Sequence, residues 1–174
     1  MDGDRFDDFY SAQFADVWRF ARRRTETSED ADDVVAETFV VAWRRRADIP
    51  ADGARLWLFG VARNVLANHR RETRRRDRLH LRLLAEDPPP AEYQDAEPGG
   101  GELWQALAAL PPDDRELLLL RAWERLGASD IATLLGISSA TVSSRLHKAR
   151  RRLDRELEHR RGQETARPRE DRHA

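Results

Sequence analysis

A stretch of proline, glycine and acidic residues near the middle of the chain limits its fold more than any other feature. Residues 86–101, EDPPPAEYQDAEPGGG, hold four prolines, three glycines and five acidic residues. This composition buries too little apolar surface to pack a core and is typical of an extended acidic linker. The sequence therefore predicts two small domains, residues 1–84 and 102–160, joined by a linker over residues 85–101. Residues 161–174 are expected to form a disordered tail.

The residues before the linker have the apolar spacing of helices. In residues 5–24, apolar side chains recur at intervals of three and four, which marks one face of a helix. Residues 27–46 open with Thr-Ser-Glu-Asp, a start that resembles a capping box, and continue with the same period. A proline and a glycine place a loop at residues 47–54, and residues 54–84 return to helical spacing. No strand is expected, so the predicted fold class is all-α.

The residues after the linker predict further helices. A leucine-rich helix is expected to stop at Pro111 and Pro112, with Asp113 and Asp114 in the first turn of the next helix, where carboxylates are favoured. Ser129 is expected to cap a short helix over residues 130–135.

Residues 136–153, GISSATVSSRLHKARRRL, complete a predicted helix-turn-helix. Gly136 stands where a left-handed turn ends the short helix, and Ser138 is suited to cap the next one. Apolar residues then recur at intervals of four, three and four and are expected to point inward: Val142, Leu146, Ala149 and Leu153. The outward set is Ala140, Ser143, Ser144, His147, Lys148 and Arg151. Phosphate contacts are expected from Lys148, Arg150, Arg151 and Arg152. The pattern indicates duplex DNA binding, and a plain helical hairpin with solvated basic ends is the alternative.

Charge is separated into blocks along the chain, although the net charge is only −1. Residues 1–40 carry 11 acidic residues and 5 arginines, whereas residues 44–82 carry 12 arginines and 4 acidic residues. Residues 138–161 carry 8 basic and 3 acidic residues. Basic blocks favour a polyanion as partner, and acidic blocks favour basic protein surfaces. The alternative is that the arginine-rich helices only keep the protein soluble.

Several function classes find no support in the sequence. There is no cysteine, so disulfides and thiolate metal sites are excluded. The five histidines are scattered without the spacing of metal ligands, and no phosphate-binding glycine loop occurs. No catalytic site, cofactor or metal is therefore expected. No apolar run is long enough to span a membrane, and the acidic N-terminus does not resemble a signal peptide. We expect a cytoplasmic protein without membrane insertion.

Two separate stretches resemble one family. Residues 110–153 resemble region 4 of bacterial sigma factors, which binds the minus-35 promoter element, and SEDADDVVAETFVVAW with RLWLFGVARNVLANHRR resembles region 2. With two such domains and a short linker, the chain is similar to the extracytoplasmic-function (ECF, group IV) type. The resemblance implies an alternative sigma factor that binds core RNA polymerase, directs promoter-specific initiation and helps to melt the promoter. A stand-alone helix-turn-helix repressor or activator is the alternative, and a polymerase-holding decoy is a third reading.

The resemblance also implies roles for matching residues. The minus-35 element would be read by Ser139, Ala140, Ser143, Ser144, His147, Lys148 and Arg151. The minus-10 element would be met by Arg46, Asp48, Arg63, Asn64, Asn68, Arg70 and Arg71, with loop 46–54 capturing an unpaired base. Polymerase contacts would come from Asp33, Ala36, Glu37 and Phe39. Four of these residues depart from the common family pattern, namely Ala36, Asn68, Ala140 and Ser143.

The partners implied by the family are core RNA polymerase and promoter DNA. Within the polymerase, the contacts would be the β′ clamp helices and the β flap. Members of this type are commonly held inactive by an anti-sigma factor, which would cover polymerase-binding faces of both domains. The promoter sequence, the inducing signal and the identity of any anti-sigma factor are not encoded in recognisable residues.

Overall fold

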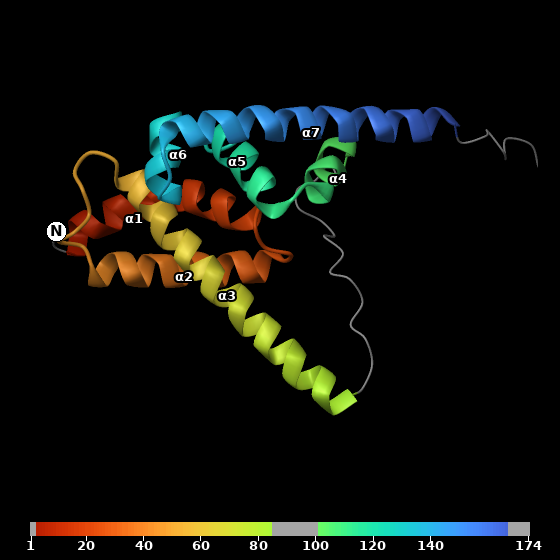
Figure 1. The fold of residues 1–174 in the computed structure, drawn as a ribbon. Helices are drawn as coiled ribbons and strands as arrows, with labels where there is room; N and C mark the ends of the chain where they lie inside the picture. Colours follow the sequence, from red (N-terminus) through yellow and green to blue (C-terminus); the bar gives the residue numbers. More distant parts are fainter. Residues whose placement is uncertain (1–2, 85–100, 167–174) are drawn as a thin grey trace, which may run out of the picture. The chain divides into compact units, whose positions relative to one another are not determined.

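The structure is a computed structural model that describes residues 3–84 and 101–166. Within those residues it consists of seven helices and contains no strand (Figure 1), which confirms the all-α prediction. The chain divides into two compact units, Met1–Glu97 and Pro98–Ala174. Apart from its last glycine, the expected linker lies outside the described residues. None of the helices within the described ranges is long and apolar enough to cross a membrane.

The first unit holds three helices that pack against one another in pairs: α1 (Gly3–Arg22), α2 (Ser28–Arg44) and α3 (Ala54–Leu84). The predicted cap of α2 is confirmed, because the Thr27 hydroxyl oxygen accepts a hydrogen bond from the Asp30 N–H at 3.0 Å. The Thr27 hydroxyl also donates to the Asp30 carboxylate at 2.8 Å. The cap satisfies a backbone N–H that has no partner inside the helix.

The core of the first unit is aromatic where α1 meets α3. Phe20 and Phe59 are fully buried and stack with their ring centroids 4.6 Å apart. The Arg24 guanidinium lies 3.7 Å from the centroid of Phe20, and the Arg55 guanidinium lies 4.6 Å from the centroid of Phe59. Each cation is attracted by the negative face of its ring. Four planar groups therefore join the end of α1 to the start of α3.

Asp16 links Arg55 to α1. Its carboxylate accepts hydrogen bonds from Arg55 Nε and Arg19 Nη2, both at 2.7 Å. Partial burial raises the pKa of Asp16, but the hydrogen bonds and charges of Arg19 and Arg55 lower it more, so the pKa lies below its usual 3.8. Asp16 therefore stabilises the first unit in its charged form.

The second unit is organised around one long helix. Against α7 (Ser139–Ala166) pack α4 (Glu102–Ala109), α5 (Pro112–Ala122) and α6 (Ala128–Leu135) (Figure 1). The core is aliphatic, and its most deeply buried members are Leu107, Leu117, Leu120, Ile131 and Val142. Because α4, α5 and α6 all contact α7, this helix organises the packing of the second unit.

Candidate nucleic-acid interface

The turn between α6 and α7 has the geometry of a helix-turn-helix. Gly136 adopts a left-handed conformation with φ of 68°, and the Ile137 N–H donates to the Ala132 carbonyl at 3.1 Å. The Ser138 hydroxyl oxygen accepts from the Thr141 N–H at 3.1 Å. Both the predicted glycine turn and the predicted serine cap are therefore confirmed.

The predicted N-cap of α6, the first helix of the helix-turn-helix, is wrong. α6 begins at Ala128, and Gly127 is its N-cap, so Ser129 lies within the helix. The Asp130 carboxylate accepts a hydrogen bond from the Gly127 N–H at 3.2 Å. Ser129 instead uses its carbonyl to accept from the Thr133 hydroxyl at 3.0 Å. Because both Ser129 and Gly127 are good caps, the local sequence did not distinguish them.

The first turns of α7 present one exposed face. Val142, Leu146 and Ala149 are buried, as predicted, whereas Leu153 is half-buried. The whole predicted minus-35 set is exposed: Ser139, Ala140, Ser143, Ser144, His147, Lys148 and Arg151. The Ser143 hydroxyl donates to the Ser139 carbonyl at 3.0 Å, so its oxygen remains able to accept from a ligand. Arg145 is also exposed on α7. The sequence reasoning missed it, although removing the buried positions from the helix would have included it.

Arg152 is exposed on α7 but pairs with another helix. Its guanidinium forms an ion pair with the carboxylate of Asp114, in the first turn of α5. Asp114 is buried, with its residue 8% exposed. The phosphate contact expected of Arg152 stays a prediction, and its guanidinium is already paired with a buried acid. Because Arg152 and Asp114 are 38 residues apart in sequence, no local sequence pattern could predict their pairing.

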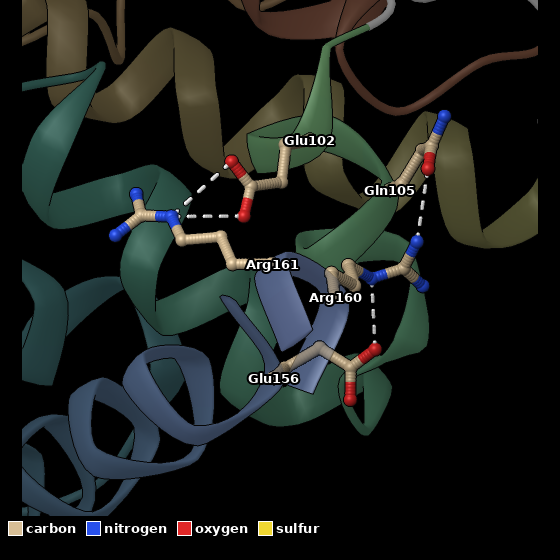
Figure 2. A network of polar contacts seen from close by, with 5 residues as sticks. All are labelled: Glu102, Gln105, Glu156, Arg160 and Arg161. Atoms are coloured by element: carbon tan, nitrogen blue, oxygen red, sulfur yellow. Dashed lines mark hydrogen bonds and ion pairs between the residues drawn. The ribbon is translucent and has the colours of Figure 1, made fainter. Parts of the chain in front are cut away.

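The end of α7 corrects another prediction. Residues 161–166, expected to be part of a disordered tail, continue the helix to Ala166. Figure 2 shows why: Arg161 Nε donates to Glu102 at 3.1 Å, and Arg160 Nη1 donates to Gln105 Oε1 at 2.9 Å. Arg160 Nε also donates to Glu156 Oε1 at 2.8 Å. Contacts with α4 therefore stabilise the last turns of α7. Residues 167–174 lie outside the described residues.

In the first unit, α3 presents polar and basic side chains to solvent. The predicted minus-10 residues on this helix are all exposed: Arg63, Asn64, Asn68, Arg70 and Arg71. Arg71 donates to the Asn68 side-chain oxygen, and Arg70 donates to the Arg24 carbonyl at 3.3 Å. His69, which lies between Asn68 and Arg70 in sequence, has its Nε2 atom 3.6 Å from the carboxylate of Glu37 on α2. Arg70 and Arg71 are thus accessible to a polyanion, and His69 links this part of α3 to α2.

The loop between α2 and α3 carries the other two predicted minus-10 residues, Arg46 and Asp48, which are exposed. The Arg46 guanidinium lies 4.7 Å from the centroid of the Trp43 ring and donates to the Trp43 carbonyl at 3.1 Å. Asp48 pairs with Arg45 at 3.0 Å. Trp57 is half-buried, with the Arg45 guanidinium 5.6 Å from its ring centroid. Aromatic and guanidinium groups therefore surround this loop.

The four predicted polymerase contacts do not share one face of α2. Asp33, Ala36 and Glu37 are exposed, but Phe39 is only 5% exposed and meets the Tyr10 ring edge-on, with centroids 4.6 Å apart. The expectation that Phe39 lies on the contact face is corrected, because α1 covers it. Val40 is 47% exposed instead.

Exposed apolar side chains on α1 and α2 were not predicted. There are four large ones in these two helices, namely Tyr10, Phe14, Val40 and Trp43. The Tyr10 and Phe14 rings lie 5.4 Å apart, and the Trp43 ring meets Phe6 edge-on at 4.9 Å. Large apolar side chains grouped at a surface favour protein contacts.

In the second unit, the Trp104 and Trp123 rings lie 5.2 Å apart and are half-buried.

Comparison with protein families decides the class of this helix-turn-helix protein. The family described as Sigma-70 region 2 matches residues 9–76, and Sigma-70, region 4 matches residues 100–153. The chain is 35% identical over 148 residues to the ECF RNA polymerase sigma factor SigL of Mycobacterium tuberculosis, covering 83% of this chain and 84% of SigL. This chain belongs to the ECF sigma factors. The sigma factor therefore directs promoter-specific transcription by RNA polymerase.

Other relatives agree with this assignment. The sigma factor is 33% identical over 148 residues to SigC of Mycobacterium tuberculosis, covering 82% of this chain and 77% of SigC. Among solved structures, CnrH in complex with the cytosolic domain of CnrY is 28% identical with a TM-score of 0.64, each chain covered to 90%. The sigma factor RpoE from Bartonella quintana, in complex with the anti-sigma factor NepR, has a TM-score of 0.70 at 23% identity. That likeness covers 90% of this chain and 98% of RpoE and shows the fold.

Proposed function

We propose that the exposed face of α7 reads the minus-35 element and that α3 with the preceding loop meets the minus-10 element. The observation that carries the proposal is the placement of the seven minus-35 candidates on one accessible face, directly after the left-handed turn at Gly136. In a helix-turn-helix, these turns enter the major groove. Residues 102–160 would form the minus-35 domain and residues 1–84 the minus-10 domain, with residues 85–101 as the linker.

Polymerase binding is proposed for the exposed face of α2. Asp33, Ala36 and Glu37 would contact the β′ clamp helices, and the neighbouring Val40 would add apolar area. Acidic and apolar groups side by side suit a basic protein surface with an apolar centre. The β flap would contact the second unit. Acting as a specificity subunit in the cytoplasm, the sigma factor would need no catalytic site of its own.

An anti-sigma factor is the further partner that we propose. The solved structure of the sigma factor RpoE from Bartonella quintana is a complex with the anti-sigma factor NepR. The exposed apolar side chains of Tyr10, Phe14, Val40 and Trp43 would be part of the surface that such a partner covers. Because Val40 would belong to both surfaces, binding of one partner would exclude the other.

The decisive experiment adds the purified protein to core RNA polymerase and measures initiation from a promoter selected with the holoenzyme. We expect initiation that depends on the protein and declines as salt rises, because phosphate contacts release counterions. Replacing His147 and Lys148 by alanine should reduce initiation at least tenfold, the worth of one or two base contacts. The exposed Glu158→Ala, on the second half of α7, is the matched control.

Two results would contradict this assignment. Tight, sequence-specific binding to a palindrome without polymerase, and no initiation with it, would favour a stand-alone repressor or activator. Binding to core polymerase without promoter-specific initiation would favour a decoy.

A further inference from the structure

The basic side chains of α7 fall into two groups according to what they contact. Those of Lys148, Arg150 and Arg151 are exposed, and within the described residues they make no hydrogen bond or ion pair. Arg152 pairs with Asp114 of α5. Arg160 and Arg161 bind side chains of α4 (Figure 2). Arg155 belongs to neither group, because its Nε donates to the Arg151 carbonyl of the same helix at 3.2 Å.

The burial of Asp114 commits Arg152 to this pair. The Asp114 side chain is 12% exposed, whereas that of Arg152 is 47% exposed. A buried carboxylate that loses its partner is strongly destabilised, so the pair is expected to persist when DNA binds. Arg152 lies one helical turn beyond Lys148, so its pair with Asp114, and not the helical period, distinguishes it from the other exposed basic residues.

We propose that Arg152 is a positioning residue for promoter recognition and that it neutralises no phosphate. The pair with Asp114 holds α7 against α5 and so sets the angle at which the exposed face of α7 meets the groove. This inference rests on the proposed function, in which that face binds the minus-35 element. Arg152 would then hold α5, and Arg160 and Arg161 would hold α4.

Salt dependence separates the two roles. A side chain that neutralises a phosphate releases counterions. Its loss therefore makes the negative slope of log K against log salt less steep by about 0.9. A charge already paired with Asp114 releases none, so its loss leaves the slope unchanged. Misplacing the reading face should instead reduce discrimination between the promoter and a copy with a scrambled minus-35 element, by roughly tenfold, the worth of one base contact.

The experiment measures both quantities on holoenzyme assembled from core polymerase and the full chain. We expect R151Q to make the slope less steep by about 0.9. We expect R152Q and D114N to keep the slope and lose discrimination, and R152K to retain it by preserving the pair. The double variant D114N/R152Q leaves no buried charge, so it reports the slope even if R152Q does not fold.

The outcomes also separate this inference from the proposed function. An unchanged slope for R151Q, together with unchanged initiation in the His147 and Lys148 variant, would reject the proposed DNA face. A less steep slope for R151Q and equally for D114N/R152Q would keep that face and overturn the positioning role of Arg152. Full discrimination in D114N and R152Q, with both variants folded, would overturn it as well.

Discussion

The two units of this sigma factor reach stability by different means. The first unit joins α1 to α3 through stacked aromatic rings and the guanidinium groups against them, with Phe20 and Phe59 fully buried. The second unit has an aliphatic core and holds its long helix with ion pairs from α4 and α5. Removing core volume should therefore matter most in the first unit, whereas the second should depend more on backbone geometry at its turns and on charge.

The largest expected effect is the loss of the central ring in the first unit. Phe59→Ala should destabilise that unit by about 3–5 kcal/mol, because it removes buried apolar surface and leaves a cavity. Hydrogen exchange resolved by peptide should show lost protection over α1–α3 and unchanged protection over α4–α7. Phe14→Ala, at a 37% exposed position, is the matched control and should cost less than about 1 kcal/mol. Equal losses from the two variants would mean that the stack is not central.

The turn of the helix-turn-helix should give the next largest effect, in the second unit. Gly136→Ala should cost about 1–2 kcal/mol because φ is 68° there. No atom lies within 4 Å of a Cβ added at this position, so the cost is conformational rather than steric crowding from neighbours. Urea unfolding of the full chain would measure it. Gly162→Ala, within α7, should instead stabilise slightly, and a loss there similar to that at Gly136 would contradict this interpretation.

At the turn between α5 and α6, a substitution is expected to raise the free energy of unfolding instead of lowering it. Arg125 has φ of 55°, and no other non-glycine in the described residues has a positive φ. Arg125→Gly should stabilise the second unit by about 1 kcal/mol, because glycine adopts this conformation without the clash of a Cβ. Arg125→Ala separates the backbone from the side chain, since alanine keeps the clash and should give no gain. The midpoint of urea unfolding reports both, and a gain for alanine equal to that for glycine would disprove the argument.

The smallest expected effect concerns acid. The pKa of Asp16 is lowered in the folded state, so this group adds stability above its unfolded pKa, and that contribution is lost as pH falls through the lower folded value. We expect Asp16→Asn to reduce stability at pH 7 by less than about 1 kcal/mol, because the ion pairs are partly exposed. Near pH 2 the difference from the parent chain should shrink, as thermal melts at the two pH values would show. A difference that grows in acid would contradict the sign.

The accuracy of the sequence predictions depended on how local each feature is. The cap at Thr27, the glycine turn at Gly136 and the cap at Ser138 depend on residues within one turn of each other, and all three were predicted correctly. The exposed face of α7 also followed from helical period alone. The choice between Ser129 and Gly127 as a cap failed because both residues suit that position.

Features that join distant residues could not be predicted in this way. Phe39 has the same helical spacing whether it faces solvent or α1, and only the packing of Tyr10 against it decides. Arg152 looks like its neighbours in a basic run until Asp114 of α5 is placed beside it. Glu102 and Gln105, far from α7 in sequence, hold its last turns.

By itself, the sequence determined an all-α chain with two groups of helices, a helix-turn-helix and a resemblance to ECF sigma factors. These follow from hydrophobic period, capping residues and turn residues, which act over one or two helical turns. The tertiary structure alone decided which arginines of α7 pair with acids on other helices and which do not. An arginine has the same local propensity in either role, and the difference arises from the desolvated partner that packing brings to it.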